Sequence, residues 1–229
     1  MLKKYSTYQL ATCIAILFHT IGLVGILFVD KEFFAGLTSY NLLLTFILII
    51  WTQQQKNVGF YTFLIASFLI GYFAEVIGVN TGMLFGEYAY GDNLGWKLLN
   101  VPLIIGINWF VIICTCGITI TALLQKIINR TTSESSISPK TLKALSVVVD
   151  GATLAVFFDW VMEPVAVALG YWKWTTPEIP FYNYVCWFVV SIILLLIFHY
   201  TNFVKQNKFA VHLLLIQFMF FLLLRTFLK

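Results

Sequence analysis

Three carboxyl residues stand inside otherwise apolar stretches of this 229-residue chain. Glu75 lies in the segment GYFAEVIG, and Asp159 and Glu163 share the segment FFDWVMEP. An ionised carboxylate at the centre of a bilayer costs at least about 2.5–3.5 kcal/mol, so acids in such segments are rare and commonly functional. Burial also favours the neutral form of a carboxyl group, which makes a dry acid available as a proton donor near neutral pH. These residues predict acid–base chemistry inside a membrane.

The spacing of Asp159 and Glu163 predicts that the two acids act as a pair. Residues four positions apart project from the same face of a helix. Because two like charges at this distance repel, we expect one group to keep its proton while the other is ionised or shares it. Pro164 follows directly and would free a backbone carbonyl in the preceding turn. The alternative interpretation is a kinked helix whose polar groups are hydrogen-bonded between helices.

Glu75 is a single acid, and a lone buried carboxyl group can simply tie two helices together. Its interpretation as a third catalytic group rests on the depth that it shares with Asp159 and Glu163. Asp150 lies nine residues before Asp159 and therefore on the opposite helical face. We interpret Asp150 as structural or interfacial.

Composition indicates an integral membrane protein. The residues are 60% hydrophobic and only 10% charged, whereas soluble domains carry about 25% charged residues. Because runs of about 20 apolar residues mark membrane-spanning helices, we predict an all-α, polytopic fold with seven transmembrane helices. The whole chain, 1–229, is expected to be one transmembrane domain with a flexible cytoplasmic loop at 129–143. The predicted spans are residues 8–29, 33–51, 58–79, 101–128, 144–170, 181–204 and 208–228.

The distribution of positive charge predicts a cytoplasmic N-terminus, because lysine and arginine concentrate on the inner side of a membrane. With this orientation, nine of the 14 lysine and arginine residues lie on the cytoplasmic side. The first span is longer than the apolar core of a signal peptide, so we interpret it as a retained helix of a multi-pass protein in the cell (inner) membrane. Glu75, Asp159 and Glu163 then lie at one depth, in the outer halves of their spans.

Two loops lie above these acids in the predicted topology. Residues 80–100 and 170–184 are rich in glycine, asparagine, tyrosine and tryptophan. Aromatic residues at the membrane surface commonly form an interfacial belt. Because the loops stand above the carboxyl groups, a lid or gate is the alternative. Asn108 and Trp109, in the fourth span, share the depth of the acids.

The sequence argues against several other classes of protein. Membrane di-iron enzymes need a dense histidine cluster, but the three histidines of this chain are isolated on three spans. We therefore exclude a di-iron enzyme and interpret the histidines, His19, His199 and His212, as packing or interface residues. The last span carries lysine only at its ends, so no buried lysine can form the Schiff base of a retinal protein. The four cysteines are interpreted as ordinary apolar side chains that pack between the spans. Neither a glycine-rich phosphate loop nor a basic patch for nucleic acid is present.

Two blocks of the sequence resemble the membrane carotenoid biosynthesis family that includes the carotenoid 1,2-hydratases, among them the bisanhydrobacterioruberin hydratases. The shared pattern is E-x-x-G-x-x-x-G-x-x-F-G-x-Y-x-Y, then VP and a tryptophan, then D-W-x-x-E-P and G-x-W-x-W. The chain is shorter than the archaeal members, so their substrate preference is not carried over. The matching residues are Glu75, Gly78, Gly82, Phe85, Gly86, Tyr88, Tyr90, Val101, Pro102, Trp109, Asp159, Trp160, Glu163, Pro164, Gly170, Trp172 and Trp174.

The resemblance implies a hydratase that adds water across the terminal C1–C2 double bond of an acyclic (ψ) carotenoid end group. Acid catalysis would protonate C2, form a tertiary cation at C1 and capture it with water, a route that requires no cofactor. Asp159 is expected to be the acid because it lies deepest, while Glu163 and Glu75 position water or stabilise the cation. The residues expected to bind the substrate are Tyr88, Tyr90, Asn108, Trp109, Trp160 and Trp172.

The implied partners follow from the same resemblance. The substrate would be γ-carotene, lycopene or a related ψ-end carotenoid, and the second reactant would be water. The lipid bilayer surrounds the protein, and other carotenoid enzymes are candidate partners. No metal and no nucleic acid is expected.

Two other functions remain open at this point. A membrane lycopene cyclase, or another isoprenoid-modifying enzyme, would begin with the same protonation, but an internal alkene would capture the cation. A proton-coupled transporter or a lipid-binding membrane protein would use the acids as a relay or as structural groups. Transporters commonly contain internal repeats with broken helices, and this sequence shows no repeat.

Overall fold

The computed structural model describes residues 5–128 and 139–228 of the chain. Among these residues, seven helical segments are long and apolar enough to cross a membrane, which confirms the predicted all-α fold with seven spans. The helices are α1 (Thr7–Phe28), α2 (Lys31–Gly36), α3 (Thr38–Thr52), α4 (Val58–Thr81), α5 (Ile104–Ile128), α6 (Pro139–Ala168), α7 (Phe181–Tyr200) and α8 (Lys208–Phe227). The strands are β1 (Tyr88–Tyr90), β2 (Lys97–Leu98), β3 (Val101–Pro102) and β4 (Trp172–Trp174).

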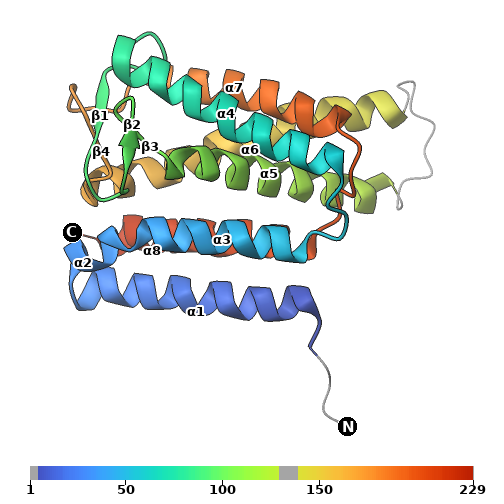
Figure 1. Cartoon of the computed structure of the whole chain (residues 1–229), viewed down its shortest axis with the longest axis horizontal. Helices are drawn as coiled ribbons and strands as arrows, with labels where there is room; N and C mark the ends of the chain where they lie inside the picture. Colours follow the sequence, from blue (N-terminus) through green and yellow to red (C-terminus); the bar gives the residue numbers. More distant parts are fainter. Residues whose placement is uncertain (1–4, 129–138, 229) are drawn as a thin grey trace.

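The long helices lie side by side, and α5 occupies the centre of the bundle (Figure 1). This helix packs against α3, α4, α6, α7 and α8, whereas α1 lies on the outside against α3 and α8. The four strands gather at the end of the bundle opposite the N-terminus. They pair as two short antiparallel sheets, β1 with β4 and β2 with β3, so one end of the bundle carries an ordered cap.

The second span consists of two helices, α2 and α3, which meet at Leu37. Residues 30–32 separate the first two predicted spans, 8–29 and 33–51, but only Asp30 precedes the helix. Its carboxylate oxygen Oδ1 accepts the backbone N–H of Phe33 at 2.9 Å. An aspartate in this position satisfies a backbone donor that the first helical turn leaves free, and Lys31 and Glu32 therefore join α2.

Other boundaries also differ from the prediction, and the sixth span ends at Tyr200 rather than at residue 204. The fourth span begins at Ile104 rather than at residue 101, because β3 pairs with β2 immediately before it. Residues 139–143, which were predicted as part of a flexible loop, belong to α6. Pro139 opens this helix, and proline suits the first helical position because its missing N–H is not needed there. The rest of the predicted loop, 129–138, lies outside the described residues.

A glycine allows α4 and α5 to approach closely near the capped end. A Cβ atom at Gly71 of α4 would lie 2.3 Å from Cγ of Trp109 of α5, a distance at which one of the helices must move. Trp109 is fully buried and stacks on Trp187 of α7 with the ring centroids 4.0 Å apart. Gly71 therefore fixes the position of a tryptophan that joins three spans.

We expect Gly71→Ala to destabilise the folded protein by about 1–3 kcal/mol, because an added methyl group overpacks a filled interior. The measurement is thermal unfolding of the purified protein in detergent. Gly36→Ala in α2 is the matched control, since a Cβ at Gly36 would meet nothing within 4 Å. Equal melting temperatures for the two variants would contradict the close contact at Gly71.

Candidate active site

The two aromatic loops predicted above the acids pair with each other as β1 and β4. Tyr88 lies opposite Trp174, and Tyr90 lies opposite Trp172. Because alternate residues of a strand point to the same side, these four aromatic side chains share one face of the pair. Between them, Ala89 and Lys173 face the other way and are more exposed. The strand pair thus presents its phenol and indole groups to the spans below.

Glycine residues hold the two strands in place. Gly82 ends α4 in the left-handed conformation with φ 67°, which glycine adopts without steric cost. In the adjoining loop, the backbone N–H of Gly91 donates to the carbonyl of Tyr171 at 2.8 Å. A Cβ atom at Gly91 would lie 2.1 Å from the carbonyl oxygen of Gly170. The close approach of the two loops therefore requires a residue without a side chain.

Glu75 of α4 accepts three hydrogen bonds from aromatic side chains. Its Oε2 receives the hydroxyl of Tyr88 in a short contact and the hydroxyl of Tyr90 at 2.8 Å. Its Oε1 receives the indole N–H of Trp109 at 3.0 Å. The carboxyl group is buried and has a donor on each oxygen.

Glu163 of α6 is held in a similar way by the opposite strand. Its Oε2 accepts the indole N–H groups of Trp172 at 2.9 Å and Trp174 at 3.2 Å. Its Oε1 lies 3.5 Å from the amide nitrogen Nδ2 of Asn183 in α7. Each strand of the cap therefore supplies two donors to one buried glutamate.

Asp159 differs from both glutamates because one of its oxygens has no partner. Oδ2 accepts the amide N–H of Asn183 at 2.9 Å, so Asn183 bridges Asp159 and Glu163. Oδ1 is buried and makes no hydrogen bond within the described residues. The side chain is completely inaccessible to solvent. A carboxyl oxygen in this situation is the natural position for a proton.

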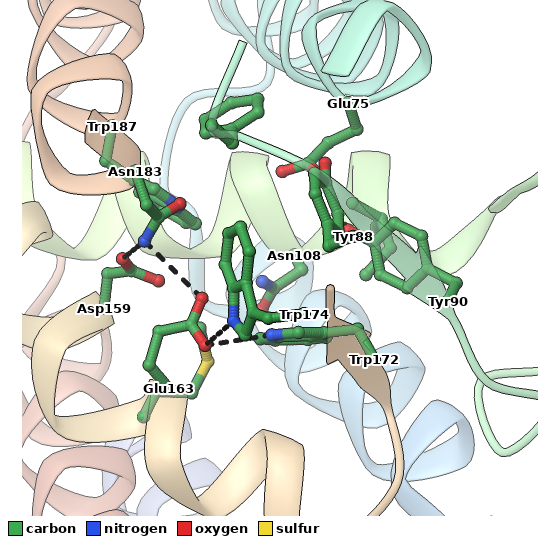
Figure 2. Close-up of a pocket in the computed structure, with 13 residues that line it drawn as sticks. Glu75, Tyr88, Tyr90, Asn108, Asp159, Glu163, Trp172, Trp174, Asn183 and Trp187 are labelled. Atoms are coloured by element: carbon green, nitrogen blue, oxygen red, sulfur yellow. Dashed lines mark hydrogen bonds between the residues drawn. The ribbon is translucent and has the colours of Figure 1, made fainter. Parts of the chain in front are cut away.

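All three carboxyl groups line one small cavity of about 20 Å³ beneath the strand pair. Figure 2 shows Asp159 and Glu163 together on one side of it, and Glu75 with Tyr88 on the other. This volume has room for about one water molecule. The lining residues are Glu75, Phe85, Tyr88, Tyr90, Ile105, Asn108, Asp159, Met162, Glu163, Trp172, Trp174, Asn183 and Trp187.

The donors of this site carry no positive charge, and no lysine or arginine is among the residues that line the cavity. Burial raises the pKa of Tyr88 and Tyr90 well above the usual value of a phenol, and the adjacent carboxyl group of Glu75 raises it further. Both phenols therefore stay protonated at neutral pH and act as donors. A negative charge on the carboxyl groups is thus stabilised without being neutralised.

The structure places most of the predicted site residues at this cavity, and two of them elsewhere. Trp109 lies behind Glu75, which it binds, and does not line the cavity. Trp160 follows Asp159 by one position and points away from the cavity. Its ring packs on Phe157, with the guanidinium of Arg225 4.1 Å from the ring centroid. The position of Trp160 gives no support to a role in substrate binding.

Asn183, Trp174 and Trp187 belong to the site but were not among the predicted site residues. Trp174 alternates with Trp172 in the WKW segment, which is a strand signal in a short aromatic run. Asn183 is a polar residue in the first turn of an apolar span, on the same side of the membrane as the acids. That signal could have identified Asn183, whereas nothing in the sequence distinguishes Trp187 from an ordinary apolar core residue.

Other titratable groups lie apart from the site. Asp150, in the N-terminal half of α6, is exposed and accepts the hydroxyl of Ser146. The imidazole of His212 contacts the hydroxyl of Thr12 at 3.0 Å between α8 and α1. Within residues 5–128 and 139–228, no group of three or more histidine, cysteine, aspartate or glutamate side chains could hold a metal ion.

A known protein family matches most of the chain. The family described as carotenoid biosynthesis protein matches residues 36–229, which include both paired strands and all three carboxyl residues. Bisanhydrobacterioruberin hydratase of Haloarcula japonica is 30% identical over 141 residues, or 60% of this chain. The matched region spans 44% of the length of that relative. No solved structure matches the chain. With most of its length matched, the chain belongs to the carotenoid biosynthesis protein family.

Proposed function

We propose that the protein is a carotenoid hydratase that adds water across the C1–C2 double bond of an acyclic ψ end group. The observation that carries this proposal is the unpaired, buried oxygen of Asp159 beside two carboxyl groups that are fully engaged with donors. An alkene is a weak base, so its protonation needs a neutral acid in a dry site. The relative from Haloarcula japonica is a hydratase by name, which supports the same reaction class.

The three carboxyl groups have different hydrogen-bond partners, and this assigns them different roles. An ionised carboxylate offers only acceptor lone pairs, which is what the three donors around Glu75 and the two indoles on Glu163 require. Asp159 accepts a single hydrogen bond and retains a free oxygen for a proton. Asp159 is therefore the acid, and the two glutamates supply negative charge.

The reaction follows from these roles. Asp159 transfers its proton to C2, and a tertiary cation forms at C1. The negative charge on Glu75 and Glu163 stabilises this cation, as do the faces of the surrounding aromatic rings. Water then adds to C1, and the proton that its oxygen releases returns to the carboxyl pair. Because the donors of the site are neutral, the charge that stabilises the cation is not cancelled by a lysine or an arginine.

The strand pair β1–β4 limits how the substrate can reach the carboxyl groups. The cavity of about 20 Å³ holds about one water molecule, and an isoprenoid end group is several times larger. The end group therefore enters only when side chains of the wall or the strand pair move. We assign the strand pair β1–β4 the role of a lid, because it carries the donors that contact Glu75 and Glu163.

Seven apolar helices make the chain a multi-pass membrane protein, which suits a substrate dissolved in the bilayer. We place it in the cell (inner) membrane with a cytoplasmic N-terminus. The capped end, which lies opposite the N-terminus (Figure 1), would then face outward.

The direct test is expression in a bacterium that accumulates lycopene or γ-carotene, with the pigments separated by chromatography and weighed by mass spectrometry. We expect a more polar pigment that is heavier by one water molecule per reacted end. A cyclic product of unchanged mass would instead identify a cyclase. Unchanged pigment in the presence of inserted, folded protein would contradict carotenoid chemistry and favour another isoprenoid substrate, transport or lipid binding.

We expect Asp159→Asn to lower hydration by about 100-fold or more, because general acid catalysis commonly contributes a factor of about 10²–10⁴. The variant keeps the shape of the side chain. Asp150→Asn is the matched control on the same helix, outside the cavity. The measurement is the rate of product formation per folded protein. Full turnover in Asp159→Asn would move the role of the acid to Glu163 or Glu75.

We expect Tyr90→Phe to lower the hydration rate by about tenfold, because Glu75 loses one of its donors and stabilises the cation less well. Tyr40→Phe is the control, since Tyr40 lies on the surface with 71% of its area exposed. The comparison uses initial rates at equal amounts of folded protein. A rate in Tyr90→Phe equal to that of the control would show that the donors of Glu75 do not support catalysis.

A further inference from the structure

A second cavity lies beside the carboxyl site and shares part of its wall. Its volume is about 60 Å³, which is room for several water molecules. The side chains that line both cavities are Ile105, Asn108, Met162 and Trp172. The remaining wall comes largely from α1, α3 and α8, the helices on the side of the bundle away from α4 and α7 (Figure 1). We call this space the polar cavity.

Three polar side chains from three different spans meet in the polar cavity: His19 of α1, Asn41 of α3 and Gln217 of α8. His19 and Gln217 are each only 5% exposed. The ring nitrogen Nδ1 of His19 lies 2.7 Å from the carbonyl oxygen of Ala15, so Nδ1 is the donor and Nε2 is an acceptor. Nδ2 of Asn41 lies 3.5 Å from this Nε2 and donates to it.

This arrangement leaves two buried acceptors without a donor. Oδ1 of Asn41 and Oε1 of Gln217 are both inaccessible to solvent and make no hydrogen bond within the described part of the chain. An unpaired buried acceptor is costly, and such groups are normally satisfied by the protein or by ordered water. A hydrocarbon carotenoid has no donor to offer, whereas water has two. The polar cavity therefore has the chemistry of a water site.

Asn108 connects the polar cavity with the carboxyl groups. It lines both spaces, and its amide makes no hydrogen bond to the described residues. Figure 2 shows Asn108 and Trp172, two of the side chains that both cavities share. An amide with free donors and a free acceptor can bind water on either side of the shared wall.

We propose that the polar cavity holds the water that adds to the carotenoid, an inference that rests on the proposed hydratase function. The cavity at the carboxyl groups has room for about one water molecule, and an alkene that reaches Asp159 displaces it. The nucleophile must then come from an adjoining space. The oxygen of this water forms the new bond to C1, and its proton passes to the ionised carboxylate of the pair.

The cation has two possible fates, and a reaction run in D₂O distinguishes between them. Captured by water, the cation becomes an alcohol that carries one deuterium on carbon. A cation that meets no water gives a proton back to the carboxylate and returns to an alkene, in which deuterium has replaced hydrogen. Loss of the water site therefore lowers hydration while exchange of deuterium into recovered substrate continues.

The test compares Gln217→Leu and Asn41→Leu with the wild-type protein, using lycopene as the probe in D₂O. We expect each variant to lower alcohol formation by about tenfold while deuterium incorporation into recovered lycopene persists or rises. Ser191→Ala is the control, since Ser191 is buried in α7 with an unpaired hydroxyl and lines neither cavity. The control should match the wild type in both readouts.

Two results would overturn the proposal. Alcohol formation at the wild-type level in both variants would show that water arrives by another path. Parallel loss of alcohol formation and deuterium exchange in both variants would show that these side chains only support the fold or the acid. A wild-type protein that neither hydrates nor exchanges lycopene would instead count against the proposed function itself.

Discussion

Carboxyl groups buried between apolar helices need hydrogen-bond donors, and this need determines the architecture of the capped end of the bundle. Each glutamate of the site receives two donors from one strand of the β1–β4 pair, and further donors from Trp109 or Asn183. The strand pair and the carboxyl groups therefore stabilise each other. Without the strands each glutamate would lose two of its donors, and without the glutamates four aromatic side chains would lose their polar contacts.

The choice of donors matters as much as their number. Phenol, indole and amide groups satisfy the carboxylate lone pairs without adding positive charge to the cavity. An arginine or a lysine would satisfy them equally well, but it would cancel the field that favours a carbocation. Arg225 packs on Trp160 outside the cavity, and Lys173 of β4 faces away from it. The proposed reaction needs negative charge in a dry environment, and the neutral donors leave such a charge uncancelled.

Much of this arrangement could be predicted from the sequence, because its signals are local. Long apolar runs gave the seven spans, and the i, i+4 spacing of Asp159 and Glu163 placed both acids on one helical face. The depth of Glu75 in its span indicated that it would join them. The pairing of the two loops could not be predicted, since it depends on contacts between distant segments, such as Gly91 with Gly170.

The roles of individual site residues were harder to predict for the same reason. Trp160 stands next to Asp159 in the sequence but faces away from the cavity, because adjacent helical residues diverge by about 100°. Asn183 bridges the two acids of α6 from another helix, a contact that no spacing reveals. The break at Leu37 falls inside the predicted span 33–51, which its apolar content marks as continuous.

The central claim is that Asp159 holds a proton at neutral pH while its neighbours are ionised. Infrared spectroscopy of the purified protein tests this claim most directly, because a neutral carboxylic acid and a carboxylate absorb at different frequencies. The account predicts a neutral-acid band at neutral pH that disappears in Asp159→Asn and persists in Asp150→Asn. A spectrum without such a band, or a band that survives in Asp159→Asn, would contradict the account.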